Sequence, residues 1–140
     1  MTNAVDNAAF ELPAGFELDP DPDRIQIDEL HSFLSEESYW AKGRARTEVE
    51  RLVRTATMVV GLYARGQMVG FARAVSDGTA FAYLADVYVL DGFRGQGLGL
   101  QLVRFVVDDP RFEGRRWLLH TKDAHGLYRK LGFTEPSPLT

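Results

Sequence analysis

The sequence contains no cysteine, so neither disulfide bonds nor thiolate-ligated metal centres can belong to this protein. Only three histidines are present, and their spacing matches no familiar metal-binding signature. Together these absences predict a protein whose chemistry does not involve a metal ion.

Long apolar runs and an excess of basic residues are lacking as well. No stretch approaches the roughly 20 apolar residues that a membrane span needs. The N-terminus also lacks the basic-then-apolar pattern of a secretion signal. The formal net charge is −4, whereas nucleic-acid-binding domains usually carry a basic surface. We therefore expect a cytoplasmic protein that binds neither membranes nor nucleic acid.

The chain of 140 residues fits one domain with a single substantial core. Residues 1–12 are small, polar and unpatterned, which predicts a loose lead-in, so the domain is expected to cover residues 13–140. Apolar periodicity and turn signals predict the order β-α-α-β-β-β-α-β-α. This order is typical of an α/β fold in which antiparallel hairpins lead into a crossover.

The predicted elements follow from local signals. Apolar spacing predicts a first helix from about Asp23, and Thr47–Glu50 reads as a capping box that opens a second one. The helix after residue 97 is expected to bury Leu98, Leu102, Phe105 and Val106, and Asp123 is expected to cap the last helix. The predicted strands are Phe16–Leu18, Met58–Ala64, Met68–Val75, Ala80–Leu90 and Trp117–Leu119.

The octapeptide Phe93–Leu100 (FRGQGLGL) is the most informative segment. It follows an almost wholly apolar run, Thr79–Leu90, and opens an apolar-periodic segment, so it predicts a strand, a glycine loop and a helix. Glycines at alternate positions let backbone N–H groups converge on an anion at a helix N-terminus. Arg94 adds a fixed positive charge there. The segment therefore predicts a phosphate-bearing ligand.

Two familiar phosphate loops do not match this segment. A P-loop ends in Gly-Lys-Ser/Thr, whereas here Gly99 is followed by Leu100 and Gln101. The dinucleotide fingerprint needs G-x-G-x-x-G and an acidic residue about 20 positions later. This chain has G-x-G-x-G, with Leu119 at that distance. A nucleotide-binding domain is therefore disfavoured.

Three segments together resemble the GCN5-related N-acetyltransferase (GNAT) family. Arg94–Gly99 matches that family's pyrophosphate loop, Arg/Gln-x-x-Gly-x-Gly/Ala. Tyr83–Val89 resembles the family's fourth strand, and Leu127–Phe133 resembles its closing helix and turn, commonly L-Y-x-K-x-G-F. The segments have the family's order and spacing, and the resemblance covers residues 16–133. It implies the acyl-CoA N-acyltransferase fold, with a central mixed, mostly antiparallel sheet flanked by helices.

The resemblance implies an enzyme that moves an acetyl group from acetyl-CoA to a small-molecule or peptide amine. Transfer would occur by direct attack in a ternary complex, which agrees with the lack of a cysteine nucleophile. The alternative is a non-catalytic acyl-CoA-binding module of the same fold. The cofactor-binding residues that the resemblance implies are Val87, Tyr88, Val89, Arg94, Gly95, Gln96, Gly97, Leu98, Gly99 and Thr121.

Two residues are the candidates for catalysis. Tyr128 matches the tyrosine usually assigned in this family as the acid that protonates the departing thiolate, although it could instead pack on an apolar helix face. Asp86 is the only charged residue in the run Thr79–Leu90, and a carboxylate in such a strand must be paired or solvated. It is our candidate for the base that activates the amine, directly or through a water, or for a group that holds the substrate's cation. The alternative is a structural pairing, with Arg73 or with backbone donors.

The segment Ser38–Arg44 falls where the family places its acceptor-binding elements. Tyr39 and Trp40 could line an acceptor pocket, although Trp40 could equally anchor the loop to the core. His125, and less strongly His120, could relay a proton because imidazole titrates near neutral pH.

The chain departs from the family pattern in three places. Asp91 stands where the family often has proline. Thr121 stands where many members have an asparagine, and its hydroxyl can make only one of the corresponding hydrogen bonds. Only seven residues follow Phe133, so the final strand is expected to be short or absent, or else a partner chain completes the sheet in a homodimer.

Overall fold

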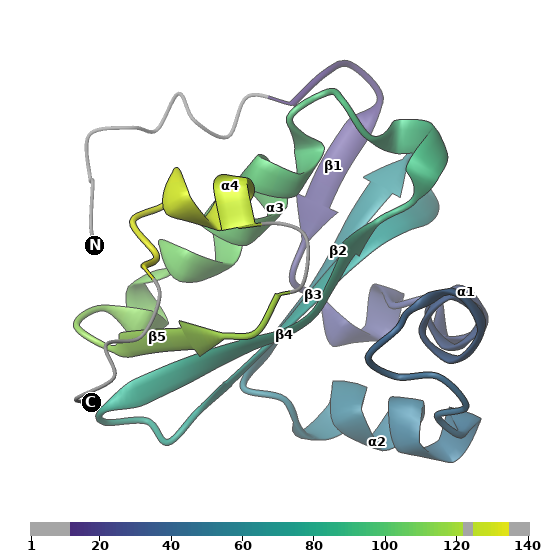
Figure 1. The fold of residues 1–140 in the computed structure, drawn as a ribbon. Helices are drawn as coiled ribbons and strands as arrows, with labels where there is room; N and C mark the ends of the chain where they lie inside the picture. Colours follow the sequence, from purple (N-terminus) through teal and green to yellow (C-terminus); the bar gives the residue numbers. More distant parts are fainter. Residues whose placement is uncertain (1–11, 122–124, 135–140) are drawn as a thin grey trace.

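The computed structural model describes residues 12–121 and 125–134, except for the side chains of His125 and Gly126 (Figure 1). Its sheet has five strands in the order β1-β2-β3-β4-β5. The first three pairs of neighbours are antiparallel and the pair β4–β5 is parallel. The strands are β1 (Phe16–Asp19), β2 (Met58–Ala64), β3 (Gln67–Ser76), β4 (Phe81–Val89) and β5 (Arg116–Leu119). The predicted mixed, mostly antiparallel α/β sheet is confirmed.

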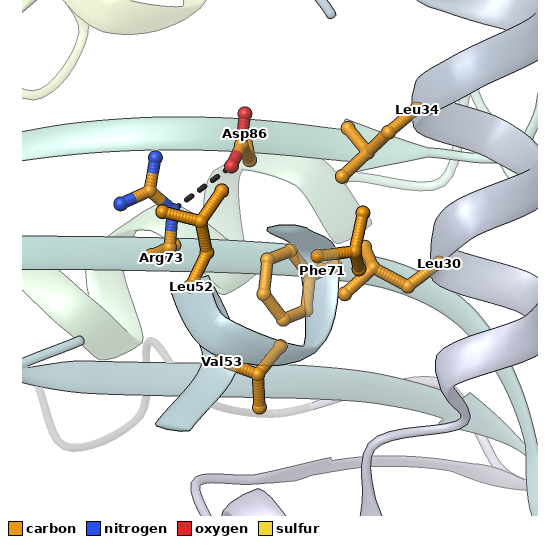
Figure 2. A pocket seen from close by; sticks show the side chains of 8 residues that line it. Leu30, Leu34, Leu52, Val53, Phe71, Arg73 and Asp86 are labelled. Carbon is orange, nitrogen blue, oxygen red and sulfur yellow. Dashed lines mark hydrogen bonds and ion pairs between the residues drawn. The ribbon is translucent and has the colours of Figure 1, made fainter. Parts of the chain in front are cut away.

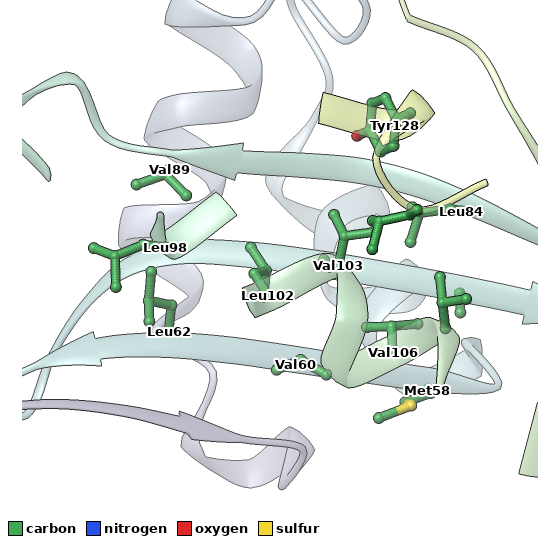
Figure 3. Packing of buried hydrophobic residues seen from close by; sticks show 14 of the residues in the cluster. Met58, Val60, Leu62, Leu84, Val89, Leu98, Leu102, Val103, Val106 and Tyr128 are labelled. Carbon is green, nitrogen blue, oxygen red and sulfur yellow. The ribbon is translucent and has the colours of Figure 1, made fainter. Parts of the chain in front are cut away.

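Helices cover both faces of this sheet (Figure 1). The helices are α1 (Ile27–Ser32), α2 (Arg46–Thr55), α3 (Leu98–Val107) and α4 (His125–Arg129). Side chains alternate between the two faces along each strand, so neighbouring residues such as Val59 and Val60 of β2 belong to different apolar clusters. One cluster packs Phe71 of β3 against side chains of α1 and α2 (Figure 2). The other packs β2 and β4 against α3 and Tyr128 of α4 (Figure 3).

Three local predictions are wrong in detail. The first α-helix begins at Ile27 instead of near Asp23, because Pro22–Arg24 form a separate 3-10 turn capped by the Asp21 carboxylate. The capping box at Thr47–Glu50 does not form, because α2 already begins at Arg46 and Thr47 lies inside its first turn. The buried face of α3 includes Val103, whereas Phe105 is only partly buried.

Other predictions lie outside the described residues. Asp123 was expected to cap α4, and a final strand after Phe133 was expected to be short or absent. Residues 122–124 and 135–140 are not described, so both stay predictions. No helix in the described ranges is long and apolar enough to span a bilayer.

Strand β4 is interrupted by a β-bulge that sequence analysis did not predict. Phe71 pairs with Tyr88 and Arg73 pairs with Ala85, so Ala72 of β3 faces two residues of β4, Asp86 and Val87. Asp86 adopts a left-handed conformation with φ of 55°, which is uncommon for residues other than glycine. Extra residues of this kind bend a strand and redirect its side chains.

Strands β4 and β5 diverge at the bulge. Their pairing runs from Phe81 with Arg116 to Leu84 with Leu119. Beyond Leu84, no described strand pairs with β4 on this side. The backbone groups of residues 85–89 that face this opening can therefore form hydrogen bonds with a ligand.

Candidate active site

The glycine loop begins just beyond the end of β4 and leads into α3. Gly95 and Gly97 have φ angles of 86° and 79°, a region that residues with a side chain rarely adopt. A side chain built at either glycine would meet no atom within 4 Å, so this face of the loop is open. Helix α3 begins at Leu98, where the first backbone N–H groups have no intrahelical acceptor and the helix dipole is positive. The loop can therefore hold an anion.

Arg94 stands beside this anion site. Its Nε donates a hydrogen bond to the carbonyl oxygen of Val89 at 2.9 Å, and its Nη1 lies 2.8 Å from the Asp91 carboxylate. The side chain is nevertheless 59% exposed. The guanidinium is thus oriented by the end of β4 and still has N–H groups available to a ligand.

Gly99 has a different function from the other two glycines. A side chain at this position would lie 3.2 Å from Cδ1 of Leu127, which belongs to α4. The lack of a side chain therefore lets α4 pack closely against the first turn of α3.

A cleft of about 340 Å³ lies where β4 and β5 diverge. Residues of β4, the end of β5, the loop before α2 and helix α4 form its walls. The described residues that line it are Tyr39, Trp40, Arg44, Arg73, Tyr83, Leu84, Ala85, Asp86, Val87, Leu119, His120, Thr121 and Tyr128. The cleft therefore brings together six residues predicted from sequence, namely Tyr39, Trp40, Asp86, Val87, Thr121 and Tyr128.

The Asp86 carboxylate accepts three side-chain hydrogen bonds. Its side chain is only 3% exposed. Oδ2 accepts hydrogen bonds from Arg73 Nε at 2.9 Å (Figure 2) and from Arg44 Nη1 at 3.0 Å. Oδ1 accepts one from the indole Nε1 of Trp40 at 2.9 Å. The pairing with Arg73 that the sequence offered as the structural alternative is present. The action of Asp86 as a base stays a prediction.

Trp40 combines the two roles considered from the sequence. Its hydrogen bond to Asp86 anchors the loop, while its side chain is 39% exposed at the cleft. Tyr39 packs edge-on against the indole, with ring centroids 5.1 Å apart. The two rings thus present an apolar surface beside a charged cluster.

Tyr88 and Val89 differ from Val87 in what they can offer a ligand. The Tyr88 ring stacks on Phe33 at 3.8 Å in the apolar layer below the sheet, where burial raises the pKa of its hydroxyl. Only its backbone can therefore belong to a binding site. Val89 is buried, and its carbonyl oxygen already accepts a hydrogen bond from Arg94. Val87 lines the cleft directly.

Tyr128 of α4 is 8% exposed and belongs to the apolar cluster beneath the cleft that its side chain lines (Figure 3). Its ring packs edge-on against Phe133, with centroids 5.8 Å apart, so the turn after α4 fixes its orientation. The side chain of His125 lies outside the described residues, so its part in acceptor binding stays a prediction.

Sequence analysis did not place Tyr83 in the site and gave His120 little weight. In the structure the Tyr83 hydroxyl lies 2.6 Å from Nδ1 of His120, because β4 and β5 are parallel and bring the two residues together at the mouth of the cleft. Tyr83 lies on the partly buried face of β4, which the almost wholly apolar sequence of this strand does not distinguish from the buried face. Its partner could be found only from the parallel pairing.

Comparisons with known proteins agree with this arrangement. Residues 54–135 match the family described as "Acetyltransferase (GNAT) domain". A crystal structure of a protein assigned to the GNAT family from Xanthomonas campestris has 37% sequence identity and a TM-score of 0.84, covering 90% of this chain and 88% of that one. A GCN5-related N-acetyltransferase of Arabidopsis thaliana, named as chloroplastic, is 29% identical over 85% of this chain and 61% of its own length. A protein of Gibberella zeae assigned as an acetyltransferase is 26% identical over 82% of this chain and 77% of its own.

The comparisons therefore agree with the fold, the glycine loop at the start of α3 and the opening between β4 and β5. The chain belongs to the GNAT family of acetyltransferases.

The Asp86 cluster yields a prediction about stability. Asp86→Asn keeps the side-chain shape and tolerates the left-handed backbone, but it leaves two largely buried guanidiniums without a counter-charge. We expect the free energy of unfolding to fall by about 3 kcal/mol, measured by urea denaturation. Asp91→Asn, at a side chain that is 86% exposed, is the control and should change it by less than about 0.5 kcal/mol. Equal losses in the two variants would contradict the importance of the cluster.

Proposed function

We propose that this chain transfers the acetyl group of acetyl-CoA to the nitrogen of an amine by direct attack in a ternary complex. The observation that carries the proposal is the continuity of three features: the open anion site at α3, the edge of β4 that no described strand pairs with beyond Leu84, and the cleft lined by both β4 and Tyr128. These features would hold the pyrophosphate, the pantetheine arm and the reacting thioester in that order.

The residues present fit the proposed cosubstrate. The left-handed glycines and the exposed guanidinium of Arg94 suit a diphosphate. The backbone of residues 87–89 suits an extended arm that carries amide groups, with Val87 facing the cleft. Thr121, at the other wall of the opening, adds a hydroxyl.

Transfer forms a C–N bond between the amine and the carbonyl carbon while the C–S bond breaks. The departing sulfur gains a proton, and we assign its donor as the Tyr128 hydroxyl. A phenol is protonated at neutral pH and can donate, and packing against Phe133 fixes its direction. The nitrogen loses its proton to a separate group.

We place that second group at His120. The Asp86 oxygens already accept three hydrogen bonds, so we propose that Asp86 positions Arg44, Arg73 and Trp40 in place of acting as the base. His120 lines the same cleft, and its Nδ1 is held by the Tyr83 hydroxyl. In the tautomer with a proton on Nδ1, its Nε2 can accept a proton.

The anion site is tested by Arg94→Ala. Loss of one charge-assisted contact should weaken CoA binding at least about tenfold, which corresponds to roughly 1.4 kcal/mol, as measured by isothermal titration calorimetry. Arg111→Ala removes a guanidinium that lies outside the cleft and pairs with Asp109, and it should leave the affinity unchanged. An unaltered affinity in Arg94→Ala would remove the pyrophosphate assignment.

The acid is tested by Tyr128→Phe. We expect kcat to fall at least about tenfold, with a change in the KM for acetyl-CoA below about threefold, because the ring and its packing are kept. Tyr63→Phe is the matched control, since the Tyr63 hydroxyl is buried without a hydrogen-bond partner among the described residues. An unchanged single-turnover rate in Tyr128→Phe would refute the assignment.

The base is tested by the pH dependence of kcat/KM. In the wild type the rate should fall toward acid pH, because a general base must be unprotonated to accept a proton. His120→Gln should lower kcat/KM about tenfold or more and abolish that acid limb. Tyr83→Phe keeps the imidazole of His120, so its kcat/KM should still decrease toward acid pH. An identical pH profile in His120→Gln and the wild type would exclude His120 as the base.

A further inference from the structure

The charges lining the cleft point to the class of acceptor, an inference that rests on the proposed function. Among the described residues of the cleft, the fixed charges are Arg44, Arg73 and Asp86. Two guanidiniums face one carboxylate, which leaves one positive charge uncompensated. The part of the cleft formed by Arg44, Arg73 and Asp86, called the cationic wall, is thus positively charged, although the whole chain carries a net charge of −4.

Each of the two arginines uses only one of its guanidinium N–H groups in a hydrogen bond to Asp86. Arg73 gives Asp86 one N–H through Nε, and Arg44 gives it one through Nη1. No other described side chain or backbone carbonyl accepts a hydrogen bond from either guanidinium, although each has five N–H groups. None of their remaining nitrogens is sealed in the core without a partner. Since both residues line the cleft, these N–H groups are available to a molecule within it.

Burial makes this excess charge costly in the absence of a ligand. The side chains of Arg73 and Arg44 are 13% and 18% exposed, so water screens them poorly. A charge held in such surroundings is stabilised by an opposite charge with matched hydrogen bonds. Guanidinium groups match the planar or tetrahedral oxygens of carboxylates and phosphates especially well.

The same cluster argues against an acceptor that carries only positive charge. The one carboxylate among the described residues of the cleft already accepts hydrogen bonds from Arg44, Arg73 and Trp40, and the two guanidiniums more than neutralise its charge. The exposed faces of Tyr39 and Trp40 beside it suit an apolar or flat part of a small molecule. The cleft volume of about 340 Å³ is also that of a small-ligand site.

We propose that the acceptor is a small amine that also carries an oxyanion, either a carboxylate or a phosphate. Arg44 and Arg73 bind the oxyanion, Tyr39 and Trp40 cover the body of the molecule, and the amine extends toward the opening between β4 and β5. Asp86 acts as a positioning residue, because it holds both guanidiniums and the indole in place.

Matched pairs of amines test this proposal by binding and by turnover. The carboxylate arm compares β-alanine and phenylalanine with their amides. The phosphate arm compares phosphoethanolamine and glucosamine 6-phosphate with ethanolamine and glucosamine. Calorimetry on the CoA-loaded protein should show at least about tenfold tighter binding of the anionic member in one arm, the gain expected from one charge-assisted contact. The arm that responds identifies the oxyanion.

Three variants link the preference to the arginines. Arg44→Gln should abolish the difference between members of the responding pair while CoA affinity stays the same. Arg44→Lys, which keeps the charge, should retain part of the preference. Arg46→Gln, two residues away and paired with Asp28 and Glu50 outside the cleft, should retain all of it. Thermal unfolding of each variant identifies any that fail to fold.

The outcomes separate this inference from the proposed function. Neutral members that bind as tightly as anionic ones in every pair, or no binding of any anionic member, would overturn the inference. Acetylated product formed from the neutral amines at the same rate would overturn the inference alone and leave the acetyl transfer intact. Tight binding of an anionic member without any acetylated product would support the cationic wall and count against the proposed transfer.

Discussion

The hydrogen bonds to the Asp86 carboxylate are the interactions on which the site depends. They join three parts of the chain that are far apart in sequence: the loop before α2 through Trp40 and Arg44, strand β3 through Arg73, and the bulge of β4 through Asp86 itself. Two of the three donors come from the loop before α2 and the third comes from β3. The carboxylate therefore determines the shape of the cleft, because without it the two guanidiniums would repel each other and the indole would lose its anchor.

The bulge lies where a carboxylate occupies the middle of an apolar strand. Asp86 has a left-handed backbone there, with φ of 55°. Its side chain lies beside apolar side chains of α1 and α2, and its charge is paired with Arg44 and Arg73. The bulge also interrupts the pairing of β3 with β4 near the point where β4 leaves β5. The bulge is thus next to both the charged wall and the part of β4 that no described strand pairs with on this side.

Sequence reasoning succeeded where the signal is local. The five strands, the glycine loop and the family were predictable because alternation, glycine spacing and turn residues act over a few positions. The single acidic residue at 86 was visible for the same reason. Helix starts were less accurate at Asp23 and Thr47, since neighbouring turns and ion pairs decide them.

The parts that sequence could not supply depend on contacts across the fold. The pairing of Tyr83 with His120 requires the parallel register of β4 and β5. The two-to-one count of arginines around Asp86 requires the loop before α2 to lie beside β3. No glycine marks the bulge in the sequence, so its position is known only from the pairing of β3 with β4.

The close packing of Leu127 against Gly99 connects helix α3 with helix α4. Gly99 belongs to the first turn of α3, whose N-terminus faces the anion site, and Leu127 precedes Tyr128 on α4. A side chain built at Gly99 would lie 3.2 Å from Cδ1 of Leu127, so the two helices pack closely at this point. The proposed anion site and the proposed acid therefore belong to helices in direct contact, whereas Arg44, Arg73 and Asp86 come from other elements of the fold.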